Sequence, residues 1–403
     1  MNLFKYFVPF AAFGIAVGAA SGASAQTVPA CSSLPNVVYM QVGDTQEPLM
    51  KALGQKLRAN TPYPLTLVYT LNGSCTNVEA LYTGVKLTTN PSYVPSATED
   101  PTWDPSKPSP TCTIDPAGVD LQVGVSATFV DSCNSGAPPA GISLFTGPIQ
   151  AYVFVTPEAS TQQALTAEEG YFVFGFGAAG QAMPWTDESL LFIRPPTKSS
   201  ALTPAAAIGV PAAKLKGVPL SASNDVVNSV SQSTNPEATM GLLGVEIYDQ
   251  HRDILNALAF RAFEQRQAYY PDSTSTAFDK QNVRDGHYLP WSPTVYIAHT
   301  DANGAVTDPR AKYVIDLVTA KQATPAPNFD PLSVVIGVNV IPECAMKVTR
   351  SFEGGDLSLY SSPAPCGCFY ESLKGTPSSS CQACPNDGDC ATGVCRHGYC
   401  EAR

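Results

Sequence analysis

The stretch Asn36-Val-Val-Tyr-Met-Gln-Val-Gly-Asp-Thr45 opens a unit that the sequence repeats between residues 36 and 84. Residues 37–42 are apolar and rich in β-branched side chains, which predicts a buried strand. The Gly43-Asp44-Thr45 turn follows, and apolar residues at helical spacing from Leu49 to Leu57 predict a helix after it. The order of the unit is strand, small polar loop, helix.

The second copy of this unit runs from Leu65 to Gly84. Residues 65–71 predict a strand, and Asn72-Gly73-Ser74 turns into a helix for which Gly84 supplies the stop. Each copy places a polar, hydroxyl-bearing loop at a helix N-terminus, and two such ends side by side suit an anion. Ordinary helix capping explains either loop alone equally well.

The N-terminus has the features of a secretory leader. Lys5 precedes an apolar run over residues 6–20, and Ala23-Ser24-Ala25 provides small residues for cleavage before Gln26. Residues 1–25 are therefore predicted to be a signal peptide, which leaves 403 − 25 = 378 residues for two domains and an appendage. No later stretch approaches the roughly 20 apolar residues that span a bilayer, so we expect a periplasmic or secreted protein.

Composition and motifs argue against several function classes. A formal charge of −11 and the lack of a basic run argue against nucleic acid as a partner. No Gly-x-Ser-x-Gly elbow occurs, and the histidines form no His-Glu-x-x-His arrangement. We therefore expect neither an enzyme nor a cofactor. The four histidines are His251, His287, His299 and His397.

Strand and helix patterns alternate along the chain, which indicates an α/β fold. Ser126 ends a further buried-strand pattern, Arg194 directly follows a predicted strand, and Asn224 caps a helix predicted over residues 226–232. With these residues and the two loops, the chain resembles the periplasmic phosphate-binding proteins of ABC transporters over about residues 37–340. Arg194 with Ser199-Ser200 resembles that family's Arg…Ser-Gly-Thr anion clamp.

The resemblance implies a two-lobed type II periplasmic-binding-protein fold with a small disulfide-rich C-terminal appendage. The divisions expected are lobe I over residues 26–150 with a Pro-rich insert at 88–116, lobe II over 151–290, a return to lobe I over 291–350, and a Cys-rich tail over 351–403.

The resemblance also implies that a small oxyanion, phosphate or similar, is held between the lobes, and that an ABC permease is the partner. The family's proton-accepting Asp position reads Ala127 here, which removes an acceptor that favours a protonated oxyanion over one such as sulfate. Read alone, Arg194 equally suits a surface strand end, and each Ser suits a turn or cap. The ligand-binding residues expected are Asp44, Thr45, Gly73, Ser74, Ser126, Arg194, Ser199, Ser200 and Asn224.

Twelve cysteines in an exported chain predict disulfide bonds. The segment from Cys381 to Cys400 is too short for a core, so cross-links are expected to hold it. The alternative is a zinc site formed by Cys381-x-x-Cys384 and His397. Export favours disulfides over zinc, so we expect no metal. The tail is foreign to plain phosphate-binding proteins and suggests a second hypothesis, a secreted or surface interaction protein whose tail engages a partner. The disulfide candidates are Cys31, Cys75, Cys112, Cys133, Cys344, Cys366, Cys368, Cys381, Cys384, Cys390, Cys395 and Cys400.

Overall fold

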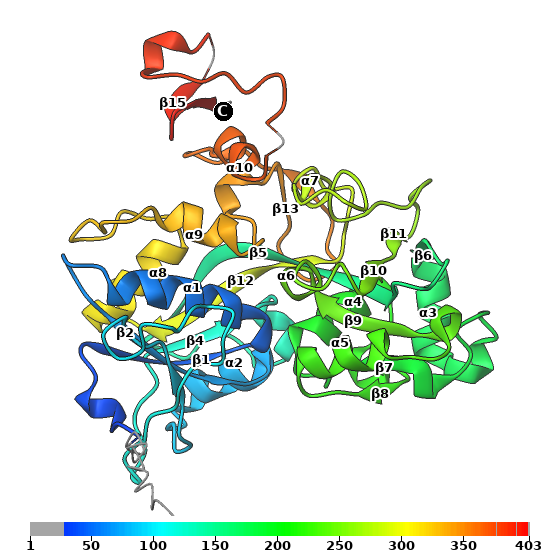
Figure 1. Cartoon of the computed structure of the whole chain (residues 1–403), viewed down its shortest axis with the longest axis horizontal. Coiled ribbons are helices and arrows are strands. Elements are labelled where there is room, and N and C mark those ends of the chain that lie inside the picture. Colours follow the sequence, from blue (N-terminus) through cyan, green and yellow to red (C-terminus); the bar gives the residue numbers. More distant parts are fainter. Residues whose placement is uncertain (1–27, 376, 392, 402–403) are drawn as a thin grey trace, which may run out of the picture.

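The computed structural model describes residues 28–375, 377–391 and 393–401, so the predicted signal peptide lies outside the described residues. Two lobes lie side by side along a common sheet, and the C-terminal segment forms a smaller body beyond them (Figure 1). Within the described ranges, no helix has the length and apolar character needed to span a bilayer.

The common sheet has ten strands in the order β3-β2-β1-β4-β12-β5-β9-β7-β8, with β10 paired to β5. Strand β5 (Ile142–Pro157) joins the lobes, because its residues 142–151 pair with β12 and its residues 152–155 pair with β9. The proposed lobe boundary at residues 150 and 151 falls inside this strand. The other strands of the sheet are β1 (Val37–Val42), β2 (Thr66–Leu71), β3 (Ser92–Tyr93), β4 (Val123–Ser126), β7 (Leu191–Ile193), β8 (Val218–Pro219), β9 (Met240–Gly244), β10 (Leu255–Ala257) and β12 (Trp291–His299).

Lobe I, which we define by strands β1 to β4, has the repeated unit that the sequence predicts. Strands β1 and β2 are parallel neighbours, and each leads into a helix, α1 (Glu47–Arg58) or α2 (Ser74–Thr83). Gly84 ends α2 in the left-handed conformation, at φ 69°. The apolar stripe of α1 packs on one face of the sheet with α8 (Pro309–Val318) and α9 (Pro331–Gly337). Helix α2 belongs to a separate apolar cluster, in which it packs against residues of β12.

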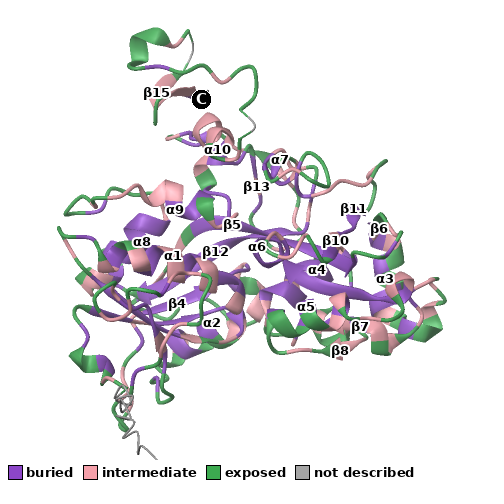
Figure 2. Ribbon diagram, in the orientation of Figure 1, coloured by how far each residue is buried: buried purple, intermediate pink, exposed green. Residues whose placement is uncertain are grey.

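Lobe II, which we define by strands β7 to β10, forms the other large core. Its helices surround the second half of β5 together with β7 and β9, and Phe154, Phe174 and Phe260 are buried at its centre. Figure 2 shows buried residues concentrated along the strands of both lobes, whereas the C-terminal body is largely exposed. The helices are α3 (Ala167–Phe176), α4 (Ser199–Ala207), α5 (Ser223–Ser231), α6 (Val245–Tyr248) and α7 (Gln281–Arg284), and a separate pair of strands is β6 (Ala164–Thr166) with β11 (Ala259–Arg261).

The Pro-rich insert at residues 88–116 covers the open edge of lobe I. Its strand β3 pairs antiparallel with β2, and its Trp103 is buried in the core of lobe I. Cys112 bonds to Cys31, which anchors the insert to the start of the described chain. The edge of the sheet is therefore covered, which removes a site for unwanted strand pairing.

The disulfide prediction is confirmed, because all twelve cysteines are paired. No tail thiolate is left for zinc, and His397 instead stacks on Phe369 with ring centroids 4.5 Å apart. Strand β13 (Val348–Thr349) precedes the tail, and the tail contains β14 (Ser358–Leu359), α10 (Gly367–Leu373), β15 (Val394–Arg396) and β16 (Tyr399–Glu401). The bonds are Cys31–Cys112, Cys75–Cys133, Cys344–Cys366, Cys368–Cys381, Cys384–Cys395 and Cys390–Cys400.

Candidate anion site between the lobes

The loops that follow parallel strands come together where the two lobes meet. From lobe I, the turn at Gly43–Thr45 follows β1 and the turn at 72–74 follows β2. From lobe II, Arg194 directly follows β7, and the first residues of α4 and α5 lie on the same side. Ligands of open α/β sheets bind at the carboxyl ends of strands, so these loops form the candidate site.

The centre of the site is an ion pair that crosses from one lobe to the other. Arg194 of lobe II donates from Nη2 to Oδ2 of Asp44 in lobe I, at 2.5 Å. Ser223, the first residue of α5, donates to the same oxygen from its backbone N–H at 2.9 Å and its hydroxyl at 2.8 Å. Lys198 lies 3.2 Å from the other carboxylate oxygen. Every one of these donors belongs to lobe II.

The pair is largely closed off from solvent. The side chain of Arg194 is 0% exposed and that of Asp44 is 12% exposed. Burial alone would raise the pKa of Asp44, but the charges of Arg194 and Lys198, with hydrogen bonds from Arg194 and Ser223, outweigh it and lower the pKa. Asp44 is therefore ionised at neutral pH, and the lobe II donors surround a negative charge.

A second contact between the lobes lies at the start of α2. The backbone N–H of Cys75 donates to the carbonyl of Thr197 at 3.1 Å, and Nζ of Lys198 donates to the carbonyl of Asn72 at 3.3 Å. A Cβ atom on Gly73 would lie 2.8 Å from that Thr197 carbonyl oxygen and 2.7 Å from its hydroxyl. Glycine is therefore required here, because any side chain would force the lobes apart.

The predicted hydroxyl residues from lobe I are all buried. The Ser74 hydroxyl accepts from the backbone N–H of Ala127 at 3.1 Å, and the Ser126 hydroxyl donates to the carbonyl of Thr128 at 2.8 Å. Both hydroxyls are therefore engaged inside lobe I. The Thr45 hydroxyl has no hydrogen-bond partner among the described residues, so its full bonding capacity is free.

Of the site residues predicted in lobe II, some are buried at the site and one is exposed. Ser199 and Ser200 are buried in the first turn of α4, and within the described chain the Ser200 hydroxyl has no partner. Asn224 is exposed, because α5 begins at Ser223, three residues before the predicted start at Val226, and turns Ser223 inward instead. Sequence reasoning missed Ser223 and Lys198 as site residues. The small-residue run before Asn224 was the available signal for Ser223.

A buried acid adjoins the site without belonging to the ion pair. Glu246, in α6, is 2% exposed, and neither of its carboxylate oxygens has a partner in the described chain. Burial raises the pKa of Glu246 to about 8, and the charges of Asp249 and Asp44 act in the same direction. The Glu246 carboxyl therefore carries a proton at neutral pH. Gln150 connects this region to lobe I by donating to the carbonyl of Thr45 at 3.3 Å.

A segment near the tail crosses the joint between the lobes. Glu353 accepts from the hydroxyl of Thr128 at 2.6 Å and from that of Ser292 at 2.8 Å, and Arg350 pairs with Glu353 at 3.2 Å. The neighbouring Gly354 contacts lobe II, because a Cβ there would lie 3.6 Å from Cβ of Ala206 in α4. The segment thus contacts both lobes while they are closed.

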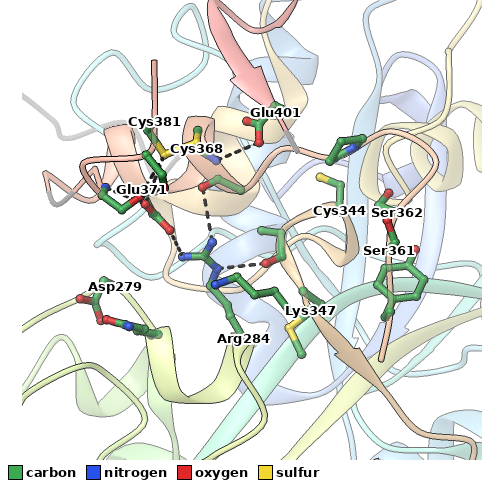
Figure 3. Close-up of a pocket in the computed structure, with 18 of the residues that line it drawn as sticks. Asp279, Arg284, Cys344, Lys347, Ser361, Ser362, Cys368, Glu371, Cys381 and Glu401 are labelled. Atoms are coloured by element: carbon green, nitrogen blue, oxygen red, sulfur yellow. Dashed lines mark hydrogen bonds and ion pairs between the residues drawn. A yellow bond between two sulfur atoms is a disulfide. The ribbon is translucent and has the colours of Figure 1, made fainter. Parts of the chain in front are cut away.

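A cavity of about 960 Å³ lies away from the ion pair, between the body and the tail. Figure 3 shows Arg284 reaching toward Glu371 of α10, to which its Nη1 donates at 3.1 Å. The guanidinium also packs 4.8 Å from the centroid of the Tyr370 ring. These contacts dock α10 on the body, and Cys344–Cys366 ties it covalently.

Comparison with known proteins places the fold. No protein-family model and no curated protein matches the chain. A solved structure from Clostridium perfringens, described as a phosphate ABC transporter substrate-binding protein with bound phosphate, matches with a TM-score of 0.51 and 12% identity. The match covers 76% of this chain and 99% of that one.

An ABC-type phosphate transport receptor from Vibrio cholerae matches with a TM-score of 0.47 and 12% identity, over 75% of this chain and 99% of its own. The chain thus resembles phosphate-binding proteins of ABC transporters in its fold, as the sequence predicts, and it adds a disulfide-rich C-terminal body.

Proposed function

We propose that this chain is an exported, non-catalytic binding protein that takes a small anion between its two lobes, with phosphate or a similar oxyanion as the free ligand. The observation that carries the proposal is the convergence of Arg194, Lys198 and Ser223 on one carboxylate. Buried Arg and a helix-start N–H are the groups that recognise oxyanions. The bound phosphate of the Clostridium perfringens protein, which shares the fold, agrees with this choice.

Several features support the remaining parts of the proposal. Six disulfides and the leader-like N-terminus favour a periplasmic or secreted location. The fold suggests an ABC permease as the partner, to which the protein would deliver its ligand. Because Ala127 offers no acceptor for a protonated ligand, we propose that sulfate binds at least as well as hydrogen phosphate.

Calorimetric titration of the purified chain with phosphate, sulfate and molybdate tests the proposal. The titration must extend into the millimolar range, because the Asp44 carboxylate competes for the same donors. Arg194→Ala should abolish the binding heat, whereas Arg261→Ala, which removes a partly exposed lobe II cation, should preserve it. If neither the native chain nor Asp44→Ala shows binding heat with any of the three anions, the proposal is wrong.

A second candidate function is that of an interaction protein whose tail engages a partner. The observation that favours it is the tail itself, a disulfide-held body that extends beyond the lobes (Figure 1). Ending the chain at residue 375, with Cys368→Ser to avoid an unpaired thiol, retains the Cys344–Cys366 anchor. If the shortened chain captures from an envelope fraction the same proteins as the full chain, the tail is not the contact.

A further inference from the structure

We propose that Asp44 is an internal ligand of the interlobe anion site. Its carboxylate occupies the position of a free oxyanion, holds the lobes closed without any solute, and makes external anions compete for the site. The inference rests on the proposed function, because it takes the lobe II donors to be an anion site. It assigns to Asp44 the role of setting the affinity and selectivity of that site.

The geometry of the donors indicates that the Asp44 carboxylate is bound as a ligand and is not an incidental ion-pair partner. Three donor groups share Oδ2 of Asp44, and a fourth, the Lys198 ammonium, faces Oδ1. Arg194 is additionally oriented by Ser223, which accepts from Nη1 at 3.1 Å, and by the carbonyl of Ser221, which accepts from Nη2 at 3.0 Å. Two contacts within lobe II thus orient the guanidinium in addition to its bond to Asp44, as expected of a site that is arranged before its anion arrives.

The position of Asp44 in the chain explains why it can act as a ligand. It belongs to a short 3-10 turn that follows β1 in lobe I, while its partners lie about 150 residues later in lobe II. The contact can form only when the lobes close. A tethered carboxylate competes at an effective concentration of about a millimolar or more, so a free anion must overcome that advantage before it binds.

The charges in the site determine whether Asp44 and a free anion can be bound at the same time. Arg194 and Lys198 together carry two positive charges, and Asp44 neutralises one of them. A divalent oxyanion that enters while Asp44 remains would meet a buried like charge, which disfavours it strongly. Binding therefore requires that the Asp44 side chain withdraws, and removing the carboxylate should expose an unoccupied site with two cations.

Titration of phosphate and sulfate into the native chain, Asp44→Ala and Asp120→Ala tests the inference. Asp120→Ala removes the same charge from the same lobe, but its side chain is 80% exposed. We expect Asp44→Ala to bind at least ~10-fold more tightly than the native chain, and Asp120→Ala to match the native chain. Equal affinity of all three proteins overturns the inference and leaves the proposed function standing.

The closed state of the solute-free protein provides a readout that does not depend on binding. Small-angle scattering should show a compact native chain and a larger radius of gyration for solute-free Asp44→Ala, which phosphate reverses. Asp44→Asn retains the size of the side chain without its charge and serves if the alanine variant folds poorly. An Asp44→Asn or Asp44→Ala chain that is as compact as the native one, without solute, overturns the inference even if no anion binds.

Discussion

Nη2 of Arg194 and Oδ2 of Asp44 lie 2.5 Å apart across the joint between the lobes, with the guanidinium fully buried. The two residues come from loops that follow different strands of one sheet, β7 and β1. Under the proposal above, their contact fills the anion site with part of the protein's own chain. The stability of the closed protein should therefore depend on both members of the pair together.

Removing one member of this pair should cost more than removing both. Arg194→Met leaves Asp44 buried with only Lys198 as a cation, which we expect to lower the free energy of unfolding by about 3 kcal/mol. Arg194→Met with Asp44→Ala should regain most of that loss, because the buried carboxylate that lacked its guanidinium is also gone and only Lys198, whose side chain is 13% exposed, loses a partner. Urea unfolding of both single variants and the double variant measures the coupling. Strictly additive losses would contradict it.

A methyl group on Gly73 should separate the lobes. Gly73→Ala places Cβ 2.8 Å from the carbonyl oxygen of Thr197, and this backbone atom cannot move alone. We expect a loss of about 1–3 kcal/mol and a larger radius of gyration in small-angle scattering. Gly337→Ala is the matched control, because a Cβ at that position meets nothing within 4 Å. Two variants of equal compactness would show that the lobes do not meet at Gly73.

Glu246 should make the protein less stable as the pH rises. Its pKa is about 8 when folded, against an ordinary value of 4.5, so the unfolded chain loses a proton that the folded chain keeps. Stability therefore falls between about pH 4.5 and 8, by no more than about 5 kcal/mol from this group. Glu246→Gln keeps the neutral shape and removes the titration.

The difference in unfolding free energy between Glu246→Gln and the native chain should therefore grow in favour of the variant from pH 4.5 to pH 8. Thermal or urea unfolding at several pH values measures it. Glu79→Gln, on the exposed side of α2, is the control and should track the native chain. A difference that does not change with pH would mean that Glu246 is ionised in the folded protein.

The C-terminal strand should stabilise the start of α10. The Glu401 carboxylate accepts from the backbone N–H groups of Cys368 at 3.0 Å and Phe369 at 2.9 Å, in the manner of a helix cap. Glu401→Ala should cost about 1 kcal/mol locally. Faster hydrogen exchange at these two amides, with unchanged exchange in β1 and β9, is the expected result. Unchanged protection at both amides would show that other contacts hold α10.

Local patterns were enough to predict the repeated unit of lobe I. The spacing of Leu49, Met50, Leu53 and Leu57, and the apolar run over residues 37–42, depend only on how neighbouring side chains face one core. The sequence also predicted disulfides, because export and cysteine number are properties of the chain itself. It could not predict which cysteines pair, since pairing depends on distances in the folded chain.

By itself, the sequence determined the fold class, the loops at the helix starts and the presence of an Arg after β7. Only the tertiary structure decided that Asp44 meets Arg194, and that Ser223 faces the site while Asn224 faces solvent. The physical reason is that strand and helix patterns are written within a few residues. The partner of a buried charge is selected by the closure of two lobes whose contacts lie about 150 residues apart.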